Sequence, residues 1–229
     1  MKINISRGDV LKFQHLLLSW GRENFAEFPW RISRSPFHSL IAELLLQRTK
    51  AEQVKPVYIQ FKRRFRSIKS LAMSSEEEVK KIIGSLGLHW RARWIHKLGV
   101  HLHTKNNSRI PEEQEELERL PGVGPYAAGA YLSLHRNVRA AILDSNVIRL
   151  YSRYFGFNAG PETRREKWLS EFAKKITPEK DFKIFNYALL DFTRLICKPK
   201  PLCQDCFFKN KCNYYKSKNN EGETNDTKK

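Results

Sequence analysis

All four cysteines of the chain lie in one segment near its end, "CKPKPLCQDCFFKNKC", at Cys197, Cys203, Cys206 and Cys212. Disulfides are the ordinary alternative, but the start "MKINISRGDVLKFQ" resembles no signal peptide, and an intracellular chain argues against them. Four clustered thiolates are typical ligands of zinc or of an iron–sulfur cluster. Zinc sites commonly pair two Cys-X-X-Cys units, and this segment has one. The spacing therefore favours an iron–sulfur cluster and leaves zinc as the alternative.

Three side chains in other segments could take part in acid–base or electrostatic chemistry. Glu43 interrupts the apolar run "LIAELLLQRT", and an apolar setting favours the protonated form of a carboxyl, which can then act as a general acid. Asp144, in "ILDSN", stands where a helix cap belongs, and such a residue taken alone is more often a cap than a catalyst. Tyr126 follows a glycine-rich turn on an apolar helix, where a core role is the ordinary reading.

The stretch "LERLPGVGPYAAGAYLSL", residues 117–134, breaks an apolar helix at two glycines and restarts it at once. Gly122 and Gly124 can adopt backbone angles closed to other residues, which would let two helices fold into a tight hairpin. Amides without side chains at a helix start can also approach a phosphate oxygen. The loop alone leaves both interpretations open.

Helical periodicity dominates the chain and alternating strand patterns are nearly absent, so we expect an all-α protein. Ser35 and Pro36 mark one helix start, and Ser74 with Glu77 is expected to form a capping box at another. Further helices are expected over about 9–22, 51–65, 90–105, 112–119, 125–135, 145–155, 162–176 and 182–196.

The charge balance points to a polyanionic partner. Lys and Arg total 42 against 24 acidic residues, which gives a net charge of +18 and a pI near 9.9. Nucleic acid is favoured over a membrane surface, because neither a basic amphipathic anchor nor an apolar run of about 18 residues stands out. We therefore expect no membrane association.

The "LPGVG" hairpin, the following "ILDSNVIRLYSRYFG" and the cysteine cluster resemble, in this order, the helix-hairpin-helix DNA glycosylase superfamily, which is endonuclease III-like. "FPWRISRSPFHSLIAELLLQRT" and "GLHWRARWIHKL" are closest to MutY-type adenine glycosylases and Mig-type thymine mismatch glycosylases. The resemblance implies a two-lobed fold with a 4Fe–4S cluster held in the C-terminal loop. One lobe would cover 23–135 with six helices, and the other 1–22 plus 136–215. A tail at 216–229 is expected to be disordered.

The resemblance also implies roles for the three side chains. Asp144 matches the essential aspartate, which would stabilise the positive charge that develops on the sugar when the N-glycosidic bond breaks. Tyr126 stands where members with lyase activity have a Schiff-base lysine, which implies a monofunctional hydrolase that leaves an abasic site. Glu43 matches a glutamate shared by the MutY and Mig types. Gln47, one turn further on, could share its face toward an extruded base.

The hairpin glycines would grip the DNA strand, and a wedge would fill the gap left by the flipped base. Gln47 with Arg48 and Leu88 with His89 match the wedge loops. Here the chain departs from the MutY types, which look like "LQQT" and "GLGYY", and it stops soon after the cluster, where MutY types generally continue. The first cysteine interval, "KPKPL", is one residue shorter than is usual in the family.

The expected function is the removal of thymine, and also uracil, from T/G and U/G mispairs in double-stranded DNA, as the first step of base-excision repair. We expect a monomer in the cytoplasm, associated with the nucleoid. An adenine glycosylase acting on A/G or A/oxidised-G mispairs is the first alternative. A non-catalytic DNA-binding protein is the second, and the presence of both Asp144 and Glu43 argues against it.

Overall fold

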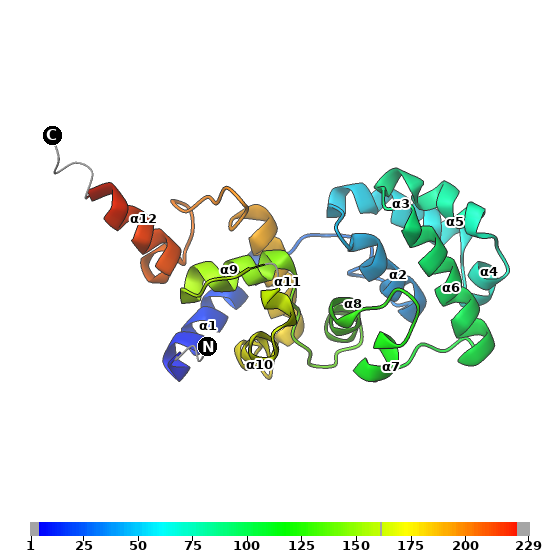
Figure 1. Cartoon of the computed structure of the whole chain (residues 1–229), viewed down its shortest axis with the longest axis horizontal. Coiled ribbons are helices and arrows are strands. Elements are labelled where there is room, and N and C mark those ends of the chain that lie inside the picture. Colours follow the sequence, from blue (N-terminus) through cyan, green and yellow to red (C-terminus); the bar gives the residue numbers. More distant parts are fainter. Residues whose placement is uncertain (1–4, 161, 224–229) are drawn as a thin grey trace. The chain divides into compact units, whose positions relative to one another are not determined.

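The computed structural model describes residues 5–160 and 162–223. Within these ranges the chain is helical and contains no strand. It divides into two compact units, one of Glu27–Val138 and one of Met1–Ala26 with Arg139–Lys229. Figure 1 shows that both units are built from helices joined by loops. No helix in the described ranges combines the length and apolar character needed to cross a membrane.

The first unit is continuous in sequence and holds most of the predicted wedge and hairpin residues. Its helices are α2 (Pro36–Leu46), α3 (Ala51–Arg64), α4 (Ile68–Ala72), α5 (Glu76–Ile83), η1 (Gly84–Leu86), α6 (Trp90–Lys105), α7 (Gln114–Glu118), α8 (Pro125–Ala130) and η2 (Tyr131–His135). Helices α4 and α5 both pack on α6. A Cβ on Gly99 of α6 would lie 2.6 Å from Leu71 of α4, so only glycine allows this close approach.

The second unit joins the two ends of the chain. Its helices are α1 (Arg7–Glu23), α9 (Ser145–Phe155), η3 (Thr163–Arg165), α10 (Lys167–Ile176), α11 (Phe182–Leu195), η4 (Lys209–Lys211) and α12 (Asn213–Glu223). Phe13 of α1 is fully buried. Its ring stacks on the ring of Phe208 in the cysteine segment, with ring centroids 4.7 Å apart. Aromatic packing thus connects the N-terminal helix to the segment that carries the thiols.

The all-α prediction is confirmed, while several element boundaries differ from the expected ones. Helix α4 was not predicted, because five residues carry too little periodicity. The capping box lies one residue later than expected, at Ser75 and Glu78, because the Ser74 hydroxyl donates instead to the Leu71 carbonyl of the preceding turn.

The C-terminal segment is also more ordered than its composition predicts. Helix α12 runs to Glu223, into the segment 216–229 for which the sequence predicts disorder, and 224–229 lie outside the described residues. Asn213 anchors the helix start through a 2.8 Å hydrogen bond from Nδ2 to the Tyr154 carbonyl. Arg153 lies 4.7 Å from the centroid of the Tyr214 ring. These tertiary contacts supply a helix nucleus that a polar sequence alone would not form.

Candidate active site and cysteine cluster

Glu43 lies in the last turns of α2 and is only 1 % exposed. Its Oε1 lies 2.7 Å from Nε2 of His135, and both side chains are almost completely buried. Its Oε2 is also buried and has no hydrogen-bond partner within the described structure. The two carboxyl oxygens of Glu43 therefore have different environments.

His135 was not found from the sequence. It ends η2, a π-helical turn that continues α8. His135 and Glu43 lie far apart in the sequence, so the sequence alone does not indicate their contact. A lone histidine at the end of an apolar run gives no periodic or spacing signal. π-Helical turns recur at functional sites, because they alter the direction of side chains at some cost in helix geometry.

The two predicted wedge loops lie in the same unit, and a buried arginine ties them together. Arg91, near the start of α6 and 2 % exposed, donates to the Leu45 carbonyl and the Gln47 carbonyl, each at 2.7 Å. It also donates to the Thr49 hydroxyl at 3.0 Å. Burial lowers the pKa of Arg91 from its ordinary value. Because Arg91 lies two residues after His89, this side chain joins one wedge loop to the other.

Each wedge loop contains a residue with a positive φ angle that is not glycine, namely Arg48 at 55° and Leu88 at 53°. Such angles are uncommon for side-chain-bearing residues, above all for leucine, and they cluster at functional sites. Helix α2 ends at Leu46, so the helical spacing that predicted a face shared by Gln47 and Glu43 stops one residue short of Gln47. Arg48 and His89 are exposed, while Gln47 and Leu88 are half-buried.

The hairpin glycines differ in their structural requirements. Gly122 has a φ of +77°, and a Cβ there would lie 3.0 Å from Cβ of Trp94, so the turn itself requires glycine. Gly124 has an ordinary φ of −101°, and a Cβ there would meet nothing within 4 Å. Gly124 is the N-cap residue of α8, followed by Pro125, and Tyr126 is half-buried in the first turn.

Asp144 lies in the other unit, at the N-cap of α9. Its Oδ1 accepts hydrogen bonds from the backbone amides of Asn146 at 2.9 Å and Val147 at 2.7 Å. Its Oδ2 accepts from the Asn146 side chain at 3.0 Å. The carboxylate is half-buried and held in one orientation. The cap role that the sequence suggests is present, and it leaves Oδ2 with further acceptor capacity.

The same helix holds the cysteine segment. Arg149 donates to the Cys197 carbonyl at 2.9 Å, and Arg153 donates to the Lys198 carbonyl at 2.6 Å. The Arg153 guanidinium also lies 3.6 Å from the Cys197 sulfur. Helix α9 therefore positions both Asp144 and the cysteine segment within this unit.

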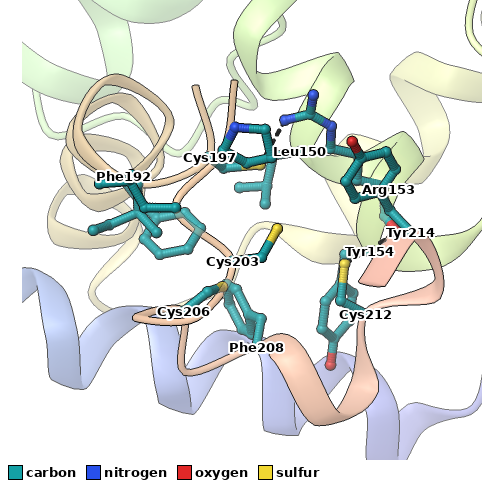
Figure 2. A pocket seen from close by; sticks show the side chains of 13 residues that line it. Leu150, Arg153, Tyr154, Phe192, Cys197, Cys203, Cys206, Phe208, Cys212 and Tyr214 are labelled. Carbon is teal, nitrogen blue, oxygen red and sulfur yellow. Dashed lines mark hydrogen bonds between the residues drawn. The ribbon is translucent and has the colours of Figure 1, made fainter. Parts of the chain in front are cut away.

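All four thiols line a single cavity (Figure 2). Apolar and aromatic side chains, among them Leu150, Phe192 and Phe208, form the rest of its wall. Burial raises the pKa of Cys206 to about 11 and also raises that of Cys203 and Cys212. These thiols hold their protons at neutral pH unless a metal displaces them.

The donor set fits a cofactor bound by four thiolates. Four soft sulfur ligands around one cavity, with a guanidinium near one of them, suit the negative charge of an iron–sulfur cluster. Within the described ranges, no three Cys, His, Asp or Glu side chains stand close enough to hold one metal ion together. The thiols thus surround a shared space rather than a common point.

The predicted residues fall into two groups. Glu43, both wedge loops, the hairpin and Tyr126 belong to the unit Glu27–Val138. Asp144 and the cysteines belong to the other unit. Sequence reasoning missed Arg91 and His135, which act through contacts distant in the chain.

Comparison with known proteins shows the family to which the chain belongs. A family model described as "HhH-GPD superfamily base excision DNA repair protein" matches residues 41–179. A thymine/uracil-DNA glycosylase of Pyrobaculum aerophilum is 39 % identical, covering 93 % of this chain and 96 % of its own. An adenine DNA glycosylase of Buchnera aphidicola is 36 % identical, and the match covers 90 % of this chain but 59 % of that protein. The solved structure of a thermostable thymine-DNA glycosylase aligns with a TM-score of 0.85 and 32 % identity, covering 91 % of this chain and 97 % of its own. The chain therefore belongs to the HhH-GPD superfamily of base-excision DNA repair proteins.

Proposed function

We propose that the protein is a monofunctional DNA glycosylase that removes thymine and uracil from mispairs with guanine, acting as a monomer on nucleoid DNA. The match to the thymine/uracil glycosylase along nearly the whole of both chains supports the choice of base. The observation that carries the proposal is the fixed carboxylate of Asp144 at the start of α9. A carboxylate that needs no reorientation can stabilise a sugar cation as the cation forms.

The reaction begins with extrusion of the target nucleotide from the duplex. The C1′–N1 bond of the nucleotide breaks, the electron pair leaves with the base, and Asp144 stabilises the charge on the sugar. Glu43 donates a proton to the departing base through its free Oε2. Water adds to C1′. Tyr126 has no amine, so no Schiff base forms at its position and the DNA strand stays intact.

DNA is held by the hairpin and the two wedge loops. The amides after Gly122 approach a phosphate, and Gln47, Arg48, Leu88 and His89 enter the gap left by the flipped nucleotide. The support is the strained backbone at Arg48 and Leu88 and the buried Arg91 that holds both loops. The net charge of +18 adds attraction to the whole duplex.

The four thiols hold a 4Fe–4S cluster in this proposal. When bound, the cluster braces the segment 197–212 beside α9, and the chemistry at the sugar needs no electron from it. Purified protein should be brown, with broad visible absorbance and about four irons per chain. Colourless protein that contains stoichiometric zinc would contradict the cluster and support the zinc alternative.

Single-turnover assays on duplexes carrying T/G, U/G, A/G and A/oxidised-G test the choice of base. We expect thymine opposite guanine to be released faster than adenine in either context. Thymine leaves as a stabilised anion, whereas adenine leaves well only after protonation, so Glu43→Gln should slow thymine release partly and adenine release far more.

Two outcomes contradict the proposal. Faster adenine release that Glu43→Gln abolishes would assign the adenine alternative. Tight DNA binding without release of any base would assign the non-catalytic alternative.

A further inference from the structure

We propose that His135 is a positioning residue for Glu43, and that it confines the transferable proton of the Glu43 carboxyl to Oε2. The inference rests on the proposed function, in which Glu43 protonates the departing base. Its starting point is the 2.7 Å contact between Nε2 of His135 and Oε1 of Glu43, in a pair whose side chains are 3 % and 2 % exposed.

The two carboxyl oxygens of Glu43 have different environments. Oε1 lies 2.7 Å from Nε2 of His135, a contact in which the proposal assigns Nε2–H as the donor, whereas Oε2 is buried and without a hydrogen-bond partner in the described ranges. A buried polar atom without a partner is destabilising, so a fold that keeps one usually has a use for it. Because Oε1 is occupied, a proton on the carboxyl resides on Oε2, where it can reach a bound base.

The backbone around His135 supports a dedicated role. The π-helical turn Tyr131–His135 follows α8 and packs against α2, the helix that carries Glu43. Two residues after its end, Asn137 has a φ of 57°, which ends the helical path. The turn therefore places His135 beside Glu43, at the last residue before the chain leaves the helix.

The balance of the step is simple. As the C1′–N1 bond breaks and its electron pair leaves with the base, the Oε2–H bond breaks and its proton moves to the base. Glu43 is left as a carboxylate, whose charge is stabilised by the Nε2–H of His135. Water then adds its oxygen to C1′ and releases its proton to solvent.

Other titratable or charged groups lie on α2 and on the elements packed against it, namely His38 on α2, Glu52, Lys55, Tyr58, Lys62, Arg63 and Arg64 on α3, Tyr126 on α8 and Tyr131 on η2. The contact that the structure shows for Glu43 is the one with Nε2 of His135, at 2.7 Å. The Tyr131 ring lies 6.5 Å from the His135 ring, and burial raises the pKa of Tyr131 to about 12, so Tyr131 stays neutral at working pH. Burial lowers the pKa of His38, whose Nε2 is engaged by the Phe65 carbonyl at 2.8 Å.

Single-turnover base release by three variants of the full chain tests the inference. His135→Leu removes the donor and should slow release roughly tenfold or more, a part of the effect of a general acid. His135→Gln keeps an N–H donor and should restore the rate to within about threefold near neutral pH, while the shape of its pH–rate profile should differ from that of the wild type, because glutamine has no titratable group. In a Glu43→Gln background the His135 substitutions should have no further effect on rate or profile. His38→Gln is the matched control. His38 is a buried histidine on α2, the helix that carries Glu43, and its replacement should leave the shape of the pH–rate profile unchanged.

A second measurement does not depend on activity. The chain has seven histidines, and ring resonances of His135 can be assigned by their absence in His135→Gln. In the wild type these resonances should follow a different pH curve from that in Glu43→Gln, because the two groups share a buried hydrogen bond.

The outcomes separate the inference from the proposed function. If the wild type releases adenine rather than thymine, the proposed base is wrong, and the same variants test the pair on adenine. If no base is released, the proposed function fails and the resonances alone decide whether the pair is coupled. Unchanged His135 resonances in Glu43→Gln, or rate losses that simply add in the double variants, overturn the inference. If His135→Leu does not fold, His135→Gln and its profile still decide.

Discussion

At the residue scale, Asp144 has a structural role and a proposed chemical role, and the two roles use different carboxylate oxygens. Oδ1 caps α9 through two backbone amides, and Oδ2 keeps acceptor capacity. Asparagine retains an oxygen for the cap but carries no charge. We expect Asp144→Asn to fold and bind DNA like the wild type, while single-turnover base release falls by about 100-fold or more.

A matched control separates the cap from the charge. Ser75→Ala removes a side-chain cap at α5 and should lower the free energy of unfolding by about 1 kcal/mol without slowing base release. Preserved release in Asp144→Asn, measured beside this control, would mean that Asp144 is only a helix cap.

Tyr126 tests the monofunctional mechanism. A phenol cannot form a Schiff base, so borohydride should trap no covalent enzyme–DNA adduct above background, and strand cleavage should need added alkali or heat. Tyr126→Lys places an amine in the first turn of α8 and should allow some trapping. Efficient trapping by the wild type would show that a lysine elsewhere in the chain acts as nucleophile.

At the element scale, substitutions at the two hairpin glycines can distinguish an effect on folding from an effect on DNA binding, because only Gly122 is required by the backbone turn. Gly122→Ala introduces a side chain at φ +77° and a Cβ contact of 3.0 Å with Trp94. It should lower the free energy of unfolding by about 1–2 kcal/mol and weaken DNA binding with it. Gly124→Ala meets nothing in the chain, so thermal unfolding should change little.

The informative result is the DNA affinity of Gly124→Ala. If amides at the start of α8 approach a phosphate, the added methyl group should weaken binding severalfold while the fold stays intact. Wild-type affinity in Gly124→Ala would show that the glycine pair serves only the turn, which is the other interpretation left open by the sequence.

At the scale of the whole molecule, the net charge of +18 predicts a strong salt dependence. Binding that neutralises many phosphates releases counterions, so affinity for a mispaired duplex should fall by roughly a thousandfold between about 50 and 200 mM salt. With enzyme in saturating excess, the rate of base release should change far less. An affinity that stays flat with salt would contradict a phosphate-dominated interface.

The sequence by itself determined the helical class, the family and most helix positions. Caps such as Ser35–Pro36 and a 3.6-residue apolar period are local signals, so they are readable without knowledge of the fold. The clustering of four cysteines and the order of the motifs are equally local. Two helices were not predicted because they lack such local signals. Helix α4 is too short to show an apolar period, and α12 depends on the tertiary contact that anchors Asn213.

Only the tertiary structure decided which side chains meet. Arg91 joins two loops far apart in the chain, and His135 reaches Glu43 across α2 and η2. No spacing rule predicts such pairs, because they depend on how helices pack and on a π-helical turn that local propensity does not encode. The two hairpin glycines look alike in the sequence, yet a positive φ angle and the nearby Trp94 require glycine at Gly122 and not at Gly124. Packing, rather than composition, sets those differences.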